Sequence, residues 1–187
     1  MRKQRFLSIG LIIMLFFSAC TKDDVQSNYT PTPVENNSGT PFVVSYSYWT
    51  DDASLNWADG ATADPSRQFD LALPELTEGE LSAGSFVLLY AKSNIDGSIQ
   101  ALPAAFADQS TNESHIYSAN YVAGTASLLH TKSVNGSYEM PGDANGISFR
   151  YIVVRPNTPD PNGRVMTIYD LLQKPYQEVI SLLAIPE

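Results

Sequence analysis

The chain has 187 residues, with 11 lysine and arginine side chains against 20 aspartates and glutamates, which gives a formal net charge of −9 at pH 7. An acidic chain without a lysine or arginine cluster repels phosphate backbones, so the composition argues against nucleic-acid binding. The single cysteine, Cys20, excludes a disulfide bond within the chain.

The first twenty residues have the order of a secretory signal. A basic start at residues 1–5 precedes an apolar run from Phe6 to Phe17, and two small residues then lead to Cys20. This run is shorter than the roughly 20 apolar residues that a transmembrane helix needs. The ending Phe17-Ser18-Ala19-Cys20 resembles the lipobox of bacterial lipoproteins, although Phe17 stands where leucine is commonest. The resemblance implies cleavage before Cys20, a diacylglyceryl group on its sulfur and an acylated new amino terminus.

A short charged motif, Lys22, Asp23 and Asp24, comes directly behind Cys20. Together with Thr21 it looks like the acidic export signal that sends some Bacteroidetes lipoproteins to the outer face of the outer membrane. The alternative is a solvated start to a linker, where lysine and aspartate are common. Several acyl chains hold a protein on a membrane stably, whereas a single chain binds only marginally. We therefore expect a protein that is lipid-anchored in the outer membrane and faces the cell exterior.

The sequence divides into three parts. Residues 1–19 are the predicted signal peptide, and their removal takes away Arg2, Lys3 and Arg5, so the net charge changes from −9 to −12. Residues 20–40 are the predicted lipidated, flexible tether, because they carry almost no large apolar side chains to offset the entropy cost of ordering. Residues 41–187 are long enough for a single domain with a hydrophobic core.

Short strands between turns make up most of this domain. Alternating or continuous apolar residues predict strands at 42–49, 68–73, 86–90, 98–102, 116–122, 137–140, 147–154 and 165–168, and two overlapping strand ranges at 125–131 and 128–134. Turn residues between them predict hairpins at Asn94-Ile95-Asp96-Gly97, Ala123-Gly124 and Asn135-Gly136. Capping-box spacing over 77–80, with Gly84 as a stop, predicts one helical turn. A closing helix is expected at about 175–183, with Pro175 at its first position.

The strand patterns also predict which side chains face the core. The strand at 42–49 is expected to place three residues on one face: Val44, Tyr46 and Tyr48. The strand at 68–73 is expected to turn three residues to the core: Phe69, Leu71 and Leu73. The unbroken apolar run at 86–90 predicts a central strand buried on both faces. The segment 147–154, rich in β-branched and aromatic residues, gives the strongest strand signal in the chain.

Seven to nine short strands with hairpin turns predict an all-β fold, an antiparallel β-sandwich with a short C-terminal helix. The alternative is an α+β arrangement with the last helix packed on an open sheet. Residues 69–187 also resemble, loosely, a group of small Bacteroidetes lipoproteins in five segments: 76–84, 86–90, Leu102-Pro103, 149–154 and 176–187. That resemblance implies the fold and the compartment, and it implies no activity.

The two histidines, His115 and His130, lie in two predicted strands of one hairpin. Counting from the Ala123-Gly124 turn places position 115 near 132 and position 130 near 117, so the two rings are expected to be close. A metal site would need a third ligand such as Glu113 or Asp108. Because the chain has no His-x-His or His-Glu-x-x-His spacing, ordinary strand histidines are the favoured interpretation, and no metal or other cofactor is expected beyond the lipid on Cys20.

Signals of catalysis are weak in this sequence. No Gly-x-Ser-x-Gly or Ser-x-x-Lys motif marks an activated serine. A carboxylate pair for glycoside hydrolysis would have to come from five aspartates that are mostly in a loop: Asp51, Asp52, Asp59, Asp64 and Asp70. Aspartate is an ordinary turn residue there. The sequence therefore favours a protein that is not an enzyme.

Binding is better supported. Trp49 and Trp57, with asparagine and aspartate side chains nearby, are the candidate ligand-binding residues, because sugar rings stack on exposed indoles. Ordinary packing of both tryptophans in the core is the competing interpretation. The favoured function is a non-enzymatic envelope module that binds a glycan, a peptide or a protein partner. The alternatives are a structural or scaffolding lipoprotein and, more distantly, a hydrolase that uses loop carboxylates.

Overall fold

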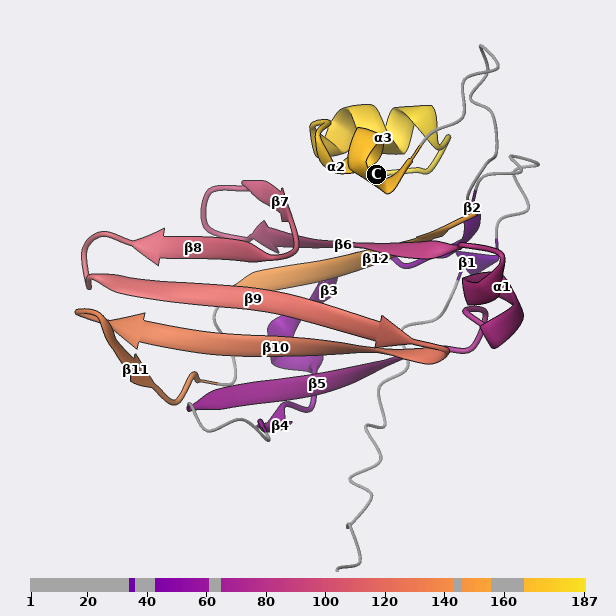
Figure 1. The fold of residues 1–187 in the computed structure, drawn as a ribbon. Coiled ribbons are helices and arrows are strands. Elements are labelled where there is room, and N and C mark those ends of the chain that lie inside the picture. The colour runs from indigo at the N-terminus through magenta and orange to yellow at the C-terminus, as the bar shows by residue number, and fades with distance from the viewer. Residues whose placement is uncertain (1–33, 36–42, 61–64, 143–145, 156–166) are drawn as a thin grey trace, which may run out of the picture.

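The computed structural model of the chain describes residues 34–35, 43–60, 65–142, 146–155 and 167–187. These residues form two antiparallel sheets that pack face to face, with helices against the outer face of one sheet (Figure 1). The predicted all-β sandwich with a C-terminal helix is confirmed.

The first sheet has the strand order β1-β2-β12-β6-β7, and β3 also pairs with β12. Its strands are β1 (Val34–Glu35), β2 (Val43–Tyr46), β3 (Thr50–Asp51), β6 (Phe86–Ser93), β7 (Ile99–Ala101) and β12 (Ile147–Val154). The second sheet has the order β4-β5-β10-β9-β8, and β11 pairs with β10. Its strands are β4 (Ala58–Asp59), β5 (Ser66–Leu73), β8 (Ala104–Asp108), β9 (Glu113–Val122), β10 (Gly124–Val134) and β11 (Ser137–Glu139).

The helices are all short. They are the 3₁₀-helix η1 (Asp52–Ser54) and the α-helices α1 (Glu78–Ser82), α2 (Ile168–Leu172) and α3 (Tyr176–Leu182). The Thr77 hydroxyl accepts a hydrogen bond from the Glu80 amide and so caps α1, as the capping-box spacing predicts. Within the described residues, no helix is both long enough and apolar enough to span a bilayer.

The core has two parts, one on each side of the first sheet. The first lies between the two sheets and includes Phe69, Leu71 and Leu73, which confirms the predicted core side of β5. The second lies between the first sheet and the C-terminal helices. Strands β6 and β12 lie inside the sheet between these two apolar layers, so all eight residues of β12 are buried. The prediction of a strand buried on both faces at 86–90 is therefore confirmed.

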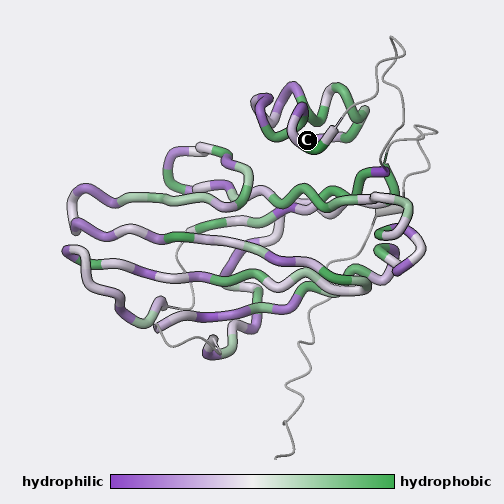
Figure 2. Tube along the Cα trace, in the orientation of Figure 1, coloured by the Kyte–Doolittle hydropathy of each residue, from purple (hydrophilic) through white to green (hydrophobic). Residues whose placement is uncertain are grey.

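Hydrophobic residues follow β6, the C-terminal helices carry both hydrophobic and hydrophilic residues, and hydrophilic residues gather at the turn between β8 and β9 (Figure 2). The predicted turns are present where the sequence placed them. Asn135 and Gly136 have φ angles of +52° and +83°, and they join Val134 to its partner Ser137. The other two predicted hairpins form at Asn94–Gly97, between β6 and β7, and at Ala123-Gly124, between β9 and β10.

The predicted face of the first long strand is wrong. Val44 packs in the core between the sheets, Tyr46 belongs to the opposite cluster, and Tyr48 is 58% exposed. The pairing of β2 with β12 shifts register between Val153 and Val154, and this bulge breaks the alternation that a regular strand would keep.

Two further predictions need correction. A strand was expected at 165–168, but Thr167 caps α2 and Ile168 is the first residue of that helix. The other two residues of the expected strand, Val165 and Met166, lie outside the described residues. The strand β8 was not predicted, because its sequence, Ala-Ala-Phe-Ala-Asp, has weak β propensity. The closing helix is present as α3, with Pro175 at the residue that precedes it.

The predicted tether contains one ordered element. Val34 and Glu35 form β1 and pair with Tyr46 and Ser45 of β2, so the sheet begins before residue 41. Cys20, Lys22, Asp23 and Asp24 lie outside the described residues, and their assigned roles stay predictions.

Candidate functional site

The two tryptophans lie on opposite sides of the first sheet. Trp57 packs in the core between the sheets, where its ring contacts Phe69 and Phe149 and its Nε1 donates to the Asp52 carbonyl at 3.2 Å. Trp49 packs in the other cluster, 5.4 Å from the ring of Tyr176. The two indoles therefore do not form one sugar platform: each is half-buried and packs in its own cluster, whereas Tyr48 of the same segment is 58% exposed.

The candidate carboxylates differ in their burial. Asp52 is buried, whereas Asp59 and Asp70 are exposed. Asp51 accepts hydrogen bonds from Asn94 and Ser148, and Asp70 accepts them from Gln68 and Ser127. Asp64 lies outside the described residues. Asp51 and Asp70 thus have different hydrogen-bond partners.

The two histidines are in contact, as the hairpin count predicts. His115 pairs with Lys132 and His130 with Tyr117, and His115 Nδ1 lies 3.0 Å from His130 Nε2. The ring of His130 is fully buried and stacks on Tyr117 at 4.2 Å.

The surroundings of the two histidines favour neutral imidazoles that hydrogen-bond to each other over imidazoles that bind a metal ion. Burial lowers the pKa of His130 to about 3 and also lowers the pKa of His115. His115 Nε2 lies 3.6 Å from Oε2 of the Glu113 carboxylate. The other oxygen of that carboxylate, Oε1, lies 2.9 Å from Lys132 Nζ. Because the two close imidazole nitrogens point at each other, they form a hydrogen bond and leave no space for an ion between them. No cluster of three or more possible metal ligands occurs in the described part of the chain.

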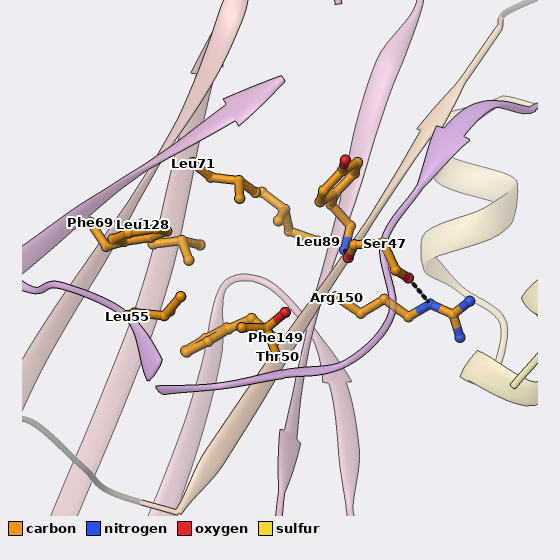
Figure 3. Close-up of a pocket in the computed structure, with 10 residues that line it drawn as sticks. Ser47, Thr50, Leu55, Phe69, Leu71, Leu89, Leu128, Phe149 and Arg150 are labelled. Atoms are coloured by element: carbon orange, nitrogen blue, oxygen red, sulfur yellow. Dashed lines mark hydrogen bonds between the residues drawn. The ribbon is translucent and has the colours of Figure 1, made fainter. Parts of the chain in front are cut away.

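A gap between the two sheets is too small to be a ligand site. It has a volume of about 10 Å³, close to the size of one water molecule, and Figure 3 shows the apolar side chains around it. Arg150 lies at its edge, with its guanidinium directed away from the gap toward the C-terminal helices (Figure 3).

Arg150 joins β12 to the C-terminal segment. Its Nε donates to the Ser47 carbonyl at 2.8 Å, its Nη1 to the Tyr176 hydroxyl and its Nη2 to the Pro186 carbonyl at 2.7 Å. The guanidinium also lies 5.5 Å from the ring centre of Tyr46. These contacts satisfy the donors of a buried cation and fix α3 on the sheet, so we assign Arg150 a structural role.

The candidate functional site is an open cleft of about 570 Å³ at one end of the sandwich. It lies between the β6–β7 turn of the first sheet and the β8–β9 hairpin of the second. Its polar lining consists of Ser93, Asp96, Ser98, Gln100, Asp108, Gln109, Ser110 and His115, and its apolar lining of Ile95, Ala105, Phe106, Ala107 and Ile147. A volume of this size is in the range of small-molecule and peptide-side-chain sites.

Two matching turns carry the carboxylates of the cleft. Oδ1 of Asp96 accepts from the amide and the hydroxyl of Ser98, at 3.0 and 2.8 Å. Oδ1 of Asp108 accepts from the amide and the hydroxyl of Ser110, at 2.8 and 2.6 Å. These hydrogen bonds lower the pKa of both carboxyl groups, so both are ionised at neutral pH.

The cleft also has a fixed wall. Gln100 Nε2 donates to the Ala105 carbonyl at 3.3 Å and thereby connects β7 to β8 across the change of sheet. Phe106 packs edge-on against Tyr117, with 6.2 Å between ring centres. An ionised, hydrogen-bonding rim above apolar side chains is suited to holding a polar or cationic ligand.

Sequence reasoning did not find this site. The repeated tripeptide pattern Asp-x-Ser, at Asp96-Gly97-Ser98 and at Asp108-Gln109-Ser110, is the signal that it could have used. Asp108 was considered only as a metal ligand beside the histidines. In the described structure it pairs in register with Glu113 and lines the cleft together with His115.

Comparisons of the chain with protein-family models, with curated proteins and with solved structures found no match. The functional proposal therefore rests on the residues and on their geometry.

Proposed function

We propose that this protein is a lipid-anchored envelope protein whose β-sandwich is a non-enzymatic binding module. The observation that carries the proposal is the cleft of about 570 Å³, with its ionised rim and apolar wall. The signal sequence that ends at Cys20 supports the anchor. The module binds a glycan, a peptide or a segment of a protein partner.

The electrostatics of the cleft favour binding over acid–base catalysis. A general acid at neutral pH needs a raised pKa, as in the acid of a glycoside hydrolase. Both Asp96 and Asp108 have a lowered pKa because serine hydrogen bonds stabilise their charged forms. Two such carboxylates attract and orient a ligand but are poor proton donors.

The position of β1 supports an outward orientation of the cleft. Val34, the first residue that the structure describes, lies within the predicted tether and pairs with Tyr46, which in turn pairs with Ile152 of β12. Ile147 and Ser93, which pair with each other at the other end of β12, line the cleft. Ile152, beside the entry of the chain, and Ile147, at the cleft, are five residues apart along β12, which corresponds to about 17 Å. The chain that leads from Cys20 therefore joins the sandwich away from the cleft.

The anchor and the binding site need separate tests. For the anchor, we expect wild-type protein to incorporate radiolabelled palmitate and to sediment with membranes, and Cys20→Ala to do neither. For the cleft, we expect the mature lipidated protein in detergent micelles to bind members of a peptide and glycan array. Ala107→Trp, which places a large ring in the cleft, should abolish that binding. Val122→Trp is the matched control, because Val122 is an exposed strand residue that does not line the cleft. Binding that survives Ala107→Trp would contradict the assignment of the site.

One observation favours the scaffolding alternative. Tyr169 and Leu172 of α2 are 75% and 40% exposed, and their spacing puts them on one face of the helix. A double change to serine at these positions that prevents co-purification with other envelope proteins, while Ala107→Trp does not, would support scaffolding through α2.

A further inference from the structure

We propose that the cleft takes an extended peptide segment of a partner protein that carries lysine or arginine side chains. This inference rests on the proposed binding function and adds the chemical class of the ligand.

The charge of the cleft has one sign. Among the described residues, its lining contains two aspartates and no lysine or arginine. Its one imidazole, His115, has a pKa lowered by burial and is neutral at pH 7. The nearby Lys132 is already paired with Glu113 at 2.9 Å. The residues that line the cleft therefore present two carboxylates, and no lysine or arginine, to an incoming cation.

The carboxylates are also held in place before a ligand arrives. Each aspartate is fixed by two hydrogen bonds from the serine two residues later, and both turns belong to tight connections between strands. A rigid acceptor loses little conformational entropy when it binds a cation, so more of the interaction energy appears as affinity.

The apolar part of the lining matches the stems of long basic side chains. Ile95 is 89% exposed at the rim, and Phe106 and Ile147 lie deeper. Lysine and arginine cover apolar surface with their methylene groups while their charged ends stay in polar surroundings. Neither a simple metal ion nor a small inorganic cation would use this surface.

The strand beside the cleft favours a peptide over a free polyamine. β8 is the last strand of the second sheet in the described structure, and four of its five residues line the cleft: Ala105, Phe106, Ala107 and Asp108. An edge strand can pair with an extended peptide, whose main-chain hydrogen bonds then add to the contacts of its side chains. A sugar ring would find no free indole in the cleft, because both tryptophans pack elsewhere.

The test measures binding of defined probes to the mature lipidated protein in neutral detergent micelles. The main probe is a fluorescent peptide, acetyl-Gly-Ser-Lys-Val-Lys-Ser-Gly-amide, followed by anisotropy at about 0.15 M salt, where the Debye length is about 8 Å. The comparison probes are the same peptide with glutamate in place of lysine, spermidine as a competitor, and neutral oligosaccharides.

The decisive variant is Asp96→Asn with Asp108→Asn, because asparagine keeps the oxygen that accepts the serine hydrogen bonds and removes only the charge. Each exposed ion pair contributes up to about fivefold in affinity, so the double variant should bind the lysine peptide about tenfold more weakly. Asp59→Asn with Glu139→Gln removes the same charge from exposed strand residues outside the cleft and should leave binding unchanged.

Each other outcome overturns the inference in a recognisable way. Equal weakening in both double variants would show general attraction to an acidic protein, and equal affinity for spermidine would remove the role of the peptide backbone. Preference for an oligosaccharide or for the glutamate peptide, blocked by Ala107→Trp, would refute the ligand class and leave the proposed binding function intact. Absence of binding to the lysine peptide refutes the inference, and absence of Ala107-sensitive binding to every probe refutes both.

Discussion

The buried histidine pair makes the stability of this protein depend on pH above the range where carboxylates titrate. His130 is fully buried, its Nε2 is engaged by His115, and its Nδ1 has no hydrogen-bond partner among the described residues. Burial lowers the pKa of His130 to about 3, against about 6.5 in an unfolded chain. Between these two pKa values, His130 is therefore neutral in the native state and protonated in the unfolded state.

The sign and size of the effect follow from this difference. Between pH 6.5 and about 3 the unfolded chain binds more protons at this position, so the free energy of unfolding falls as the pH falls. Above pH 6.5 the contribution is complete. One such site gives a slope approaching 1.4 kcal/mol per pH unit, or about 2 kcal/mol between pH 6.5 and pH 5. The lowered pKa of His115 acts in the same direction.

The assay is urea unfolding followed by tryptophan fluorescence at pH 7, 6 and 5. Trp57 is a suitable reporter because its ring lies 5.9 Å from that of His130. His130→Phe keeps an aromatic ring beside Tyr117 and should reduce the slope between pH 6 and pH 5 by about 1 kcal/mol per pH unit. The lowered pKa values of Glu80, Asp96 and Asp108 affect stability near pH 4 and below, outside this window. Equal stability of the wild type at pH 7 and pH 5, or the same slope in His130→Phe, would refute the reasoning.

Three further changes test the fold, each by the shift in its urea unfolding curve at pH 7. Arg150→Met removes the three hydrogen bonds of the buried guanidinium and should lower the free energy of unfolding by about 3 kcal/mol. A decrease below about 1 kcal/mol would contradict the role of Arg150 in fixing the C-terminal helices. Gly136→Ala should cost about 1 kcal/mol from backbone strain alone, because φ is +83° and an added Cβ meets no atom within 4 Å. Thr77→Ala should cost about 1 kcal/mol through loss of the α1 cap, whereas Thr77→Ser, which keeps the hydroxyl, should cost much less.

Local patterns determined most elements of this fold. The Asn135-Gly136 turn, the capping threonine of α1 and the apolar strand at 86–90 each follow from rules that act over a few residues. The hairpin count also placed His115 beside His130, because an antiparallel pair joined by a tight turn leaves little freedom in register. The sandwich could be inferred from the number and spacing of such strands.

The predictions that were wrong depended on contacts between distant residues. The bulge opposite Val153 and Val154 decided which side of the sheet Tyr46 occupies, and two separate cores received Trp49 and Trp57 although only a few residues lie between them. β8 is a strand because β9 pairs with it, since its own residues have little preference for that state.

The cleft belongs to the same class of feature. The sequence by itself determined two Asp-x-Ser turns and their local hydrogen bonds, because each turn closes within three residues. Only the tertiary structure decided that the turns at Asp96 and Asp108 border one cleft, since the first follows a strand of one sheet and the second a strand of the other. The packing of the two sheets, driven by burial of the core between them, brings these carboxylates to the same cleft.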